Sequence, residues 1–550
     1  MTDTARIRAL FVAAAAALGL LALVIFSQPL YDDVDNYTVA LVVNGLFGKD
    51  NGCQYTHVLL NRLMSVFSGL LPGADVFTLL GRVLITGAFV LLLYMTGIRA
   101  RTGLLSGVLL SFFLFLSVCI SLFSGNYGIQ AIFFAGTGIT VLRLADSKTD
   151  RFPVFFGALL LAFGFLWRLQ VSLLFVPFLL LEVVCGHFSG MGKRTVLPLA
   201  LVFLLFAVQA IQERREPLMS SLAYDRPRIR YQDYGAKDWP EVEAEAQERG
   251  ITHAEYEMVD QWLLLDTGTI TAKKLQDIAG ISGKTDYPLT PAGLLEAVKV
   301  LRWYFVGESV FNYVWLLGIV LGALAVTVAA SGIRGHLQPL LILLGGQLII
   351  FIYLILGRAP MRLIHSVYLV QSFALLWAGL AVTKDPRGRR KSLLTMGLCL
   401  LLVLFGGSGL LSLAGSGFQR PQLALNARIG ADDSALRVAD EEGVIIWDNW
   451  GQGFNRPLMK QGKLPTKEML ALHLPAGDWI YGQSYFIRFL EEMGMPNPYE
   501  ALLDHPHRYY AVEGDTALKL YAEHTPGFKA EPAGQVSGIP LYRFGRIKPE

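Results

Sequence analysis

Two groups of charged residues have types and spacings suited to chemistry. The first group, Asp32, Asp33 and Asp35, directly follows the first long apolar run of the chain. Carboxylates in this position could be solvated at a helix end, or could bind Mg²⁺ or Mn²⁺ through their oxygens. They could also act as the general base that takes a proton from an attacking hydroxyl group. The third reading predicts a base held just above a bilayer, against a lipid-linked substrate.

The second group consists of arginines at the ends of apolar runs: Arg168 in FLWRLQ, and Arg358 and Arg362 in GRAPMR. Long cationic side chains can reach the membrane surface without any further role. Charge near the hydrocarbon is costly, however, so such residues are functional candidates by default. A guanidinium group makes paired hydrogen bonds to phosphate oxygens. We therefore expect these arginines to bind the phosphate of a polyprenyl-phosphate leaving group.

A third set contains polar and aromatic side chains that could contact a substrate. Segment 55–71 has the periodicity of an amphipathic helix along a membrane surface, with a narrow polar stripe. The run RPRIRYQDY could be a solvated patch or could line a site, and the pair at 126–127 could bind sugar or close a turn. The candidates are Tyr37, His57, Asn61, Asn126, Tyr127, Arg230, Asp233 and Tyr234.

The composition requires a membrane around these residues. Of the 550 residues, 53% are hydrophobic and 17% are charged, whereas a soluble domain carries about 25% charged residues. The net charge of +3 gives no indication of a nucleic-acid partner. The four cysteines have neither a disulfide framework nor a metal-ligand spacing.

The apolar runs predict about eleven transmembrane helices, most of them with the roughly 17 or more residues that cross a bilayer. The run that starts near Leu10 is longer than the core of a signal peptide, so we expect it to be a retained first span. The charge at Arg168 predicts a tight hairpin there rather than one long helix. The other predicted spans are 77–98, 104–122, 127–145, 153–168, 170–186, 195–212, 312–331, 338–357, 362–383 and 391–413.

The short loops set the orientation, because basic residues favour the cytoplasmic side. With a cytoplasmic N-terminus, the cytoplasmic loops contain Arg99, Arg143, Lys193 and the run KDPRGRRK, while the opposite loop at 124–127 has no basic residue. The pattern predicts a multi-pass protein of the cytoplasmic membrane with three polar segments outside it. These segments are 29–76, 213–311 and 414–550.

The predicted organisation is therefore a transmembrane domain over 1–413, with outer loops 29–76 and 213–311, and a small extracytoplasmic α/β domain over 414–550. In that domain short strand-like runs alternate with helical runs, which favours a mostly parallel sheet. The strands are predicted at 444–447, 479–481, 508–512 and 540–544. The helices are predicted at 466–473, 485–493 and 516–524.

These features together resemble the GT-C superfamily of integral membrane glycosyltransferases, and more narrowly a group of bacterial multi-pass glucosyltransferase-like proteins. The resemblance rests on Asp32, Asp33, Tyr37, a following Gly45 or Gly48, and Asn61 in the first outer loop. Two later segments carry it further: Arg230 to Tyr234, and Gly357 to Arg362. A likeness of fold alone does not establish function.

The resemblance implies an inverting glycosyltransferase that takes sugars from a polyprenyl-phosphate donor at the outer face of the membrane. Asp32 or Asp33 would be the base, and Arg168, Arg358 and Arg362 would contact phosphate. The expected acceptor is a cell-envelope polysaccharide or glycolipid, since the chain lacks the Trp-Trp-Asp signature of oligosaccharyltransferases. The alternatives are a transporter or flippase of a lipid-linked envelope precursor, and a non-catalytic envelope scaffold.

Overall fold

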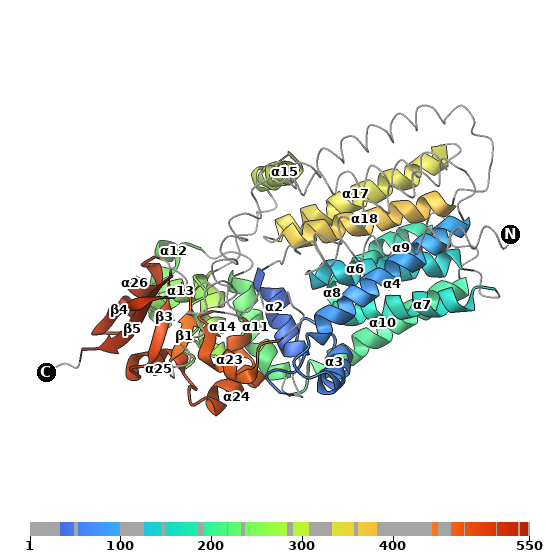
Figure 1. The fold of residues 1–550 in the computed structure, drawn as a ribbon. Helices are drawn as coiled ribbons and strands as arrows, with labels where there is room; N and C mark the ends of the chain where they lie inside the picture. The colour runs from blue at the N-terminus through green and yellow to red at the C-terminus, as the bar shows by residue number, and fades with distance from the viewer. Residues whose placement is uncertain are drawn as a thin grey trace. The chain divides into compact units, whose positions relative to one another are not determined.

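A computed structural model gives the fold, which is mostly helical and divides into two compact units (Figure 1). Unit 1 comprises 1–32, 78–209 and 287–416, and unit 2 comprises 33–77, 210–286 and 417–550. Unit 2 thus combines three stretches close to the polar segments 29–76, 213–311 and 414–550. The residues that the structure describes are 33–48, 53–99, 126–145, 149–184, 192–216, 218–232, 237–282, 290–306, 333–356, 361–381, 443–448, 464–477, 479–512, 514–536 and 539–547.

Unit 1 is built from helices. Within the described ranges, three segments are long and apolar enough to cross a membrane: Val76–Thr96, Tyr127–Leu144 and Leu337–Ile355. The spans expected near Leu10 and at 104–122, 312–331 and 391–413 lie outside the described residues, so the total of about eleven stays a prediction. The helices lying wholly or mostly in unit 1 are α4 (Val76–Arg99), α6 (Tyr127–Leu144), α7 (Arg151–Trp167), α8 (Leu169–Ser172), α9 (Phe175–Val184), α10 (Gly192–Gln212), α15 (Pro291–Val306), α17 (Ile333–Ile355) and α18 (Met361–Ala381).

Helix α6 is the centre of unit 1, and residues 127–142 of it are buried on all sides. Small residues let α7 approach it closely, as is typical of helices packed in membranes. A Cβ atom at Gly164 would lie 2.6 Å from the backbone nitrogen of Ala135, and one at Gly138 would lie 2.6 Å from the carbonyl oxygen of Gly157. The two backbones are therefore in direct contact along the helix pair.

Helix α18 packs on another face of α6 and runs in the same direction. The ring of Phe373 fills the space above Gly136, where a Cβ would lie 2.5 Å from it. One turn further on both helices, the Trp377 indole N–H donates to the Thr140 hydroxyl at 2.6 Å. These two contacts, four residues apart on each helix, fix the register between α6 and α18.

The predicted break at Arg168 is confirmed. Helix α7 ends at Trp167, and Arg168 has an extended backbone (φ −159°, ψ 96°) before the single turn of α8. The ring of Phe175, at the start of α9, lies 6.2 Å from that of Phe373 and 5.6 Å from that of Trp377. The chain thus turns back toward the middle of the bundle, with α8 forming the turn.

Unit 2 is a helical and sheet-containing assembly. Its helices begin at recognisable caps: Thr252 and Glu255 form a capping box on α13, and Asn497 caps α25 ahead of a proline. The helices are α2 (Asp33–Val43), α3 (Val58–Leu70), α11 (Leu218–Gln232), α12 (Trp239–Glu248), α13 (His253–Asp260), α14 (Ala272–Ser282), α23 (Lys467–Leu472), the 3-10 helix η2 (Trp479–Gly482), α24 (Ser484–Glu492), α25 (Pro498–Asp504) and α26 (Thr516–His524).

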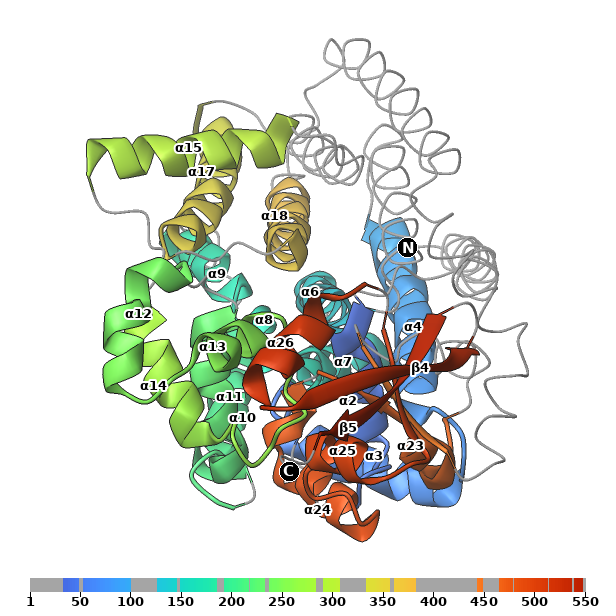
Figure 2. The same ribbon diagram turned by 90° about the vertical axis from the view of Figure 1, so that its left-hand side faces the viewer.

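The sheet of unit 2 has the order β2-β1-β3-β5-β4. Its neighbouring strands β4 and β5 are labelled in Figure 2. Strand β1 pairs in parallel with β2 and β3, and β5 pairs antiparallel with β3 and β4. The sheet is therefore mixed, and the prediction of a mostly parallel sheet is wrong, because β4 and β5 follow each other as an antiparallel pair. Its core contains Ile445, Trp447, Ala511, Val536 and Leu541. The strands are β1 (Val444–Trp447), β2 (His473–Pro475), β3 (Arg508–Ala511), β4 (Phe528–Val536) and β5 (Ile539–Arg546).

Three of the predicted strands are confirmed as β1, β3 and β5, and all three predicted C-terminal helices are present as α23, α24 and α26. The strand predicted at 479–481 is wrong, because this run forms η2. Trp479, Ile480 and Tyr481 are all buried there, and the Tyr481 hydroxyl donates to the Pro475 carbonyl. A short apolar run that is buried throughout carries no alternation to distinguish a strand from a helical turn.

Candidate functional site

Arg168 is held at the helix break by an aromatic ring. Its guanidinium carbon lies 4.4 Å from the centre of the Tyr127 ring, within the range of a cation–π contact. Tyr127, the first residue of α6, is buried, whereas Arg168 is half-buried. The two residues, predicted as separate candidates, are therefore in direct contact at the start of α6.

Asn126 completes this end of α6 as its N-cap. Its side-chain oxygen accepts a hydrogen bond from the Ile129 amide at 3.0 Å. Gly128, two residues further on, packs closely against it, since a Cβ there would lie 3.1 Å from that oxygen and 3.8 Å from the Cδ atom of Arg168. Asn126 thus sets the start of the helix on which the Arg168 side chain rests.

Arg362 lies at the same end of unit 1. On α18, Arg362 comes eleven residues before Phe373. On α6, Asn126 comes ten residues before Gly136, the residue on which Phe373 packs. Because α18 and α6 run in the same direction, Arg362 is level with Asn126 to within about one residue step of 1.5 Å. Figure 1 shows α18 and α8 reaching the same end of the bundle. Arg358 lies outside the described residues.

The electrostatics of this end favour an anion. Both α6 and α18 begin here, and helix N-termini carry partial positive charge. Two guanidinium groups, Arg168 and Arg362, add to that field. At the other end of α6, Arg143 lies over the Trp377 ring at 5.3 Å, beside a predicted cytoplasmic loop. Arg168 and Arg362 therefore lie at the end opposite the basic loops.

The acidic cluster opens helix α2. Asp33 and Asp35 are in its first turn, where negative charge is favourable for the helix. Asp32 lies outside the described residues, and the structure describes no side chain for Asp33, Asp35 or Tyr37. The roles of these residues stay predictions.

His57 and Asn61 are buried and hydrogen-bonded within the first stretch of unit 2, residues 33–77. His57 is the N-cap of α3, and its ring nitrogen Nδ1 accepts from the Leu59 amide at 3.1 Å. Asn61 accepts from the Thr56 hydroxyl and donates to the Cys53 carbonyl at 3.2 Å. The structure thus gives both side chains a part in building the loop and the helix start.

The RPRIRYQDY run is partly buried and not simply a solvated patch. Arg230 is exposed on α11, and Asp233 and Tyr234 lie outside the described residues. Arg228 forms a buried ion pair with Asp225 at 2.5 Å, with both side chains only 2% exposed. The spacing of Asp and Arg three residues apart on a helix is the sequence signal for this pair.

The Arg228 guanidinium has further partners within unit 2. It donates to the Gln232 side chain at 2.9 Å and to the Tyr55 hydroxyl at 3.2 Å. Its carbon also lies 4.8 Å from the centre of the Trp262 ring. Trp262 has φ 61° and follows α13 in the left-handed position where glycine is the usual residue. The strained backbone at Trp262 thus coincides with a position in which its indole ring covers Arg228.

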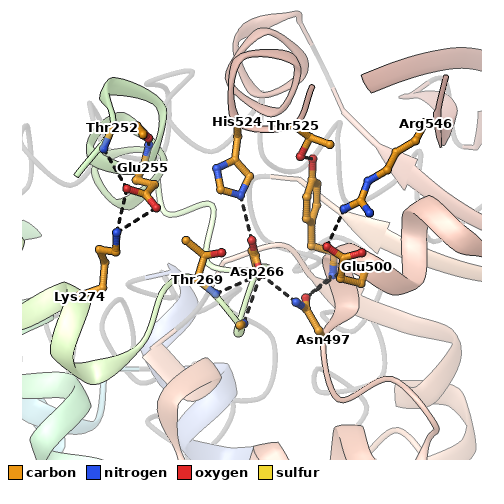
Figure 3. Close-up of polar contacts among 12 residues, drawn as sticks. Thr252, Glu255, Asp266, Thr269, Lys274, Asn497, Glu500, His524, Thr525 and Arg546 are labelled. Atoms are coloured by element: carbon orange, nitrogen blue, oxygen red, sulfur yellow. Dashed lines mark hydrogen bonds and ion pairs between the residues drawn. The ribbon is translucent and has the colours of Figure 1, made fainter. Parts of the chain in front are cut away.

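Asp266 connects the middle stretch of unit 2, residues 210–286, to its C-terminal stretch (Figure 3). Its carboxylate is 2.9 Å from His524 Nε2 and accepts from Asn497 at 2.8 Å and from the Thr269 amide at 3.2 Å. Burial raises the pKa of this carboxyl, but the hydrogen bonds from His524, Thr269 and Asn497 outweigh burial and hold the pKa below its usual value. The carboxylate thus stabilises unit 2 above the unfolded-state pKa of about 3.9, and the stabilisation is lost as the pH falls below it.

Within the described ranges, no cluster of three or more histidine, cysteine or acidic residues could hold a metal ion. Three features were not predicted from the sequence: the Arg168–Tyr127 contact, the Asp225–Arg228 pair and the Asp266 cluster. The first and the third depend on residues far apart in the sequence that folding brings together, whereas the second is a pair three residues apart on one helix whose spacing is visible in the sequence. Neither a protein-family model, nor a curated protein, nor a solved structure matches the chain.

Proposed function

We propose that the protein is an inverting glycosyltransferase that uses a polyprenyl-phosphate-linked sugar at the outer face of the cytoplasmic membrane. The observation that carries the proposal is the guanidinium of Arg168, placed 4.4 Å from the centre of the Tyr127 ring at one end of a bundle where Arg362 also lies. Two arginines and two helix N-termini at the end of an apolar bundle suit an anion attached to a lipid.

Phosphate suits the way Arg168 is held. A guanidinium that packs over an aromatic ring through its face keeps its N–H groups in its own plane, where they can donate to other acceptors. Those N–H groups match the oxygens of a phosphate group in a paired arrangement. Fixing the arginine before the substrate arrives places positive charge where negative charge develops on the leaving group, which lowers the barrier.

The reaction is a single displacement. An acceptor hydroxyl oxygen attacks the anomeric carbon, the bond from that carbon to the phosphate oxygen breaks, and the polyprenyl phosphate leaves with the electron pair. The hydroxyl proton passes to a carboxylate, for which we propose Asp32 or Asp33, with Asp35 nearby in the sequence. The proposed acceptor is a cell-envelope polysaccharide or glycolipid.

The test is sugar transfer by the purified full-length protein in nanodiscs, with a panel of radiolabelled polyprenyl-phosphate sugars and native membrane lipids as acceptors. The variants are Asp32→Asn, Asp33→Asn and Arg168→Gln. We expect one aspartate variant to abolish transfer and Arg168→Gln to lower it by about 10²-fold or more, as for loss of a group that stabilises developing charge.

Matched controls are Arg226→Gln and Glu243→Gln, which change exposed residues on helices α11 and α12. Both controls should transfer sugar at the wild-type rate. If no donor supports transfer although the wild-type protein binds lipid-linked sugars, the glycosyltransferase proposal fails and a flippase or scaffold takes its place. Equal activity in the Arg168 and Arg226 variants would refute the phosphate site.

A further inference from the structure

Helix α3 presents part of its apolar face outward. Val66 is 63% exposed, Leu70 is 70% exposed and Leu59 is 41% exposed. At about 100° per residue these three side chains lie within roughly 40° of one another around the helix. A continuous apolar face of this kind on a surface helix normally turns toward a protein core. In α3 only Leu60 and Met64, at one edge of the apolar face, are buried in this way, and the remainder of the face is exposed or only partly buried.

The polar stripe of α3 faces the interior. Asn61 is buried and bonded to the loop before the helix, and the Ser68 hydroxyl donates to the Asn44 side chain at 3.1 Å. Buried polar groups must be hydrogen-bonded to be tolerated, and these are. The inner side of α3 thus consists of this polar stripe together with Leu60 and Met64, which are fully buried, while Leu59, Val66 and Leu70 are left on the outer side.

The chain itself indicates what covers the apolar face. Helix α4 begins at Val76, six residues after Leu70, and contains a segment long and apolar enough to cross a membrane. A helix tethered this closely to a membrane span lies within reach of the bilayer surface. Arg62 is exposed about 40° around the helix from Val66, where its stem can cover hydrocarbon while its charge reaches lipid headgroups.

We infer that α3 is an anchor in the outer leaflet, with Leu59, Val66 and Leu70 inserted among phospholipid acyl chains. Asn44, the residue after α2, links this anchor to α2 and to the start of α4, since its side chain is also the acceptor for Ser68 of α3. Asn44 donates to Asp75 at 2.9 Å and accepts from the Phe77 amide at 3.1 Å, at the start of α4.

The anchor therefore sets the height of α2, whose first turn carries Asp33 and Asp35. Insofar as these carboxylates include the base, this consequence rests on the proposed function. The insertion of α3 into the membrane does not rest on the proposed function. It can be tested without an activity assay.

The experiment places a photoreactive benzoylphenylalanine at position 66 or 70 of the full-length protein in phospholipid nanodiscs. Irradiation couples the side chain to neighbouring C–H bonds, and mass spectrometry identifies the adduct. We expect phospholipid adducts at both positions and none at the control position 243, on the exposed face of α12. A second arm adds polyprenyl phosphate, whose adduct has a different mass.

Each other result overturns the inference. Adducts absent at 66 and 70, or no more abundant than at 243, would place the apolar face in water. Cross-links within the chain or to another protein would show that protein covers this face. Adducts of polyprenyl phosphate alone would make the face a donor-binding surface instead of a membrane anchor.

Discussion

Replacing Arg228 by glutamine should strongly destabilise unit 2. The substitution leaves the Asp225 carboxylate, only 2% exposed, without its ion-pair partner at 2.5 Å. It also removes the hydrogen bonds to Gln232 and Tyr55. Removing one partner of a buried ion pair costs about 3–5 kcal/mol, which is a large part of the 5–15 kcal/mol that typically stabilises a folded domain.

The assay is thermal unfolding of the full-length protein in one detergent. The unfolding of unit 2 is detected by its cleavage with a protease at each temperature. For a unit of this size, about 3–5 kcal/mol corresponds to a lowering of the midpoint by roughly 6–20 °C. Arg226→Gln is the matched control, because the Arg226 side chain is 69% exposed and its ion pair with Glu213 is worth at most about 1 kcal/mol.

A second comparison tests the cause of the loss. Combining Asp225→Asn with Arg228→Gln removes the unpaired buried charge, so the double variant should recover part of the stability lost in Arg228→Gln alone. If Arg228→Gln unfolds at the same temperature as Arg226→Gln, the buried pair does not stabilise unit 2 and the reasoning is refuted.

Three further predictions follow from local geometry. Gly164→Ala should lower the free energy of unfolding by about 1–3 kcal/mol, because the new methyl group overpacks against α6. Gly87→Ala, with no atom within 4 Å of the new Cβ, should leave it unchanged. Thermal unfolding of the two variants checks this, and equal midpoints would contradict it. Trp262→Gly relieves the strain at φ 61° but uncovers Arg228, and we expect a net loss of stability in the same assay; a gain would mean that strain outweighs packing. Burial lowers the pKa of His473 to about 4, so the unfolded chain takes up a proton at a higher pH than the folded protein does. The free energy of unfolding should therefore fall by at most about 3 kcal/mol as the pH is lowered from 6.5 to 4. A His473→Gln variant whose stability depends equally steeply on pH would refute this.

The helices of unit 1 could be predicted because burial in lipid requires long apolar runs, and the break at Arg168 because charge is costly there. The contact of Arg168 with Tyr127 could not be predicted, since it depends on α7 and α6 packing through Gly164 and Gly138. Sequence spacing contains no information about such pairs until the helix register is known.

The sheet of unit 2 was only partly predictable for a similar reason. Strand β4 contains Pro532 and Gly534, which weaken a strand signal, and it forms as the partner of β5. On α3 the amphipathic pattern gave the polar stripe correctly but could not say that Asn61 faces inward. Periodicity locates a face, and tertiary packing decides which face is buried.

Lipid-phosphate binding at the Arg168 end of unit 1 is the central claim, and equilibrium binding of polyprenyl phosphate to the purified protein tests it most directly. Losing a charge-assisted contact of about 1.5–3 kcal/mol should weaken binding by roughly 10- to 100-fold in Arg168→Gln. Arg226→Gln should bind like the wild type. Equal affinities for all three proteins would contradict the claim.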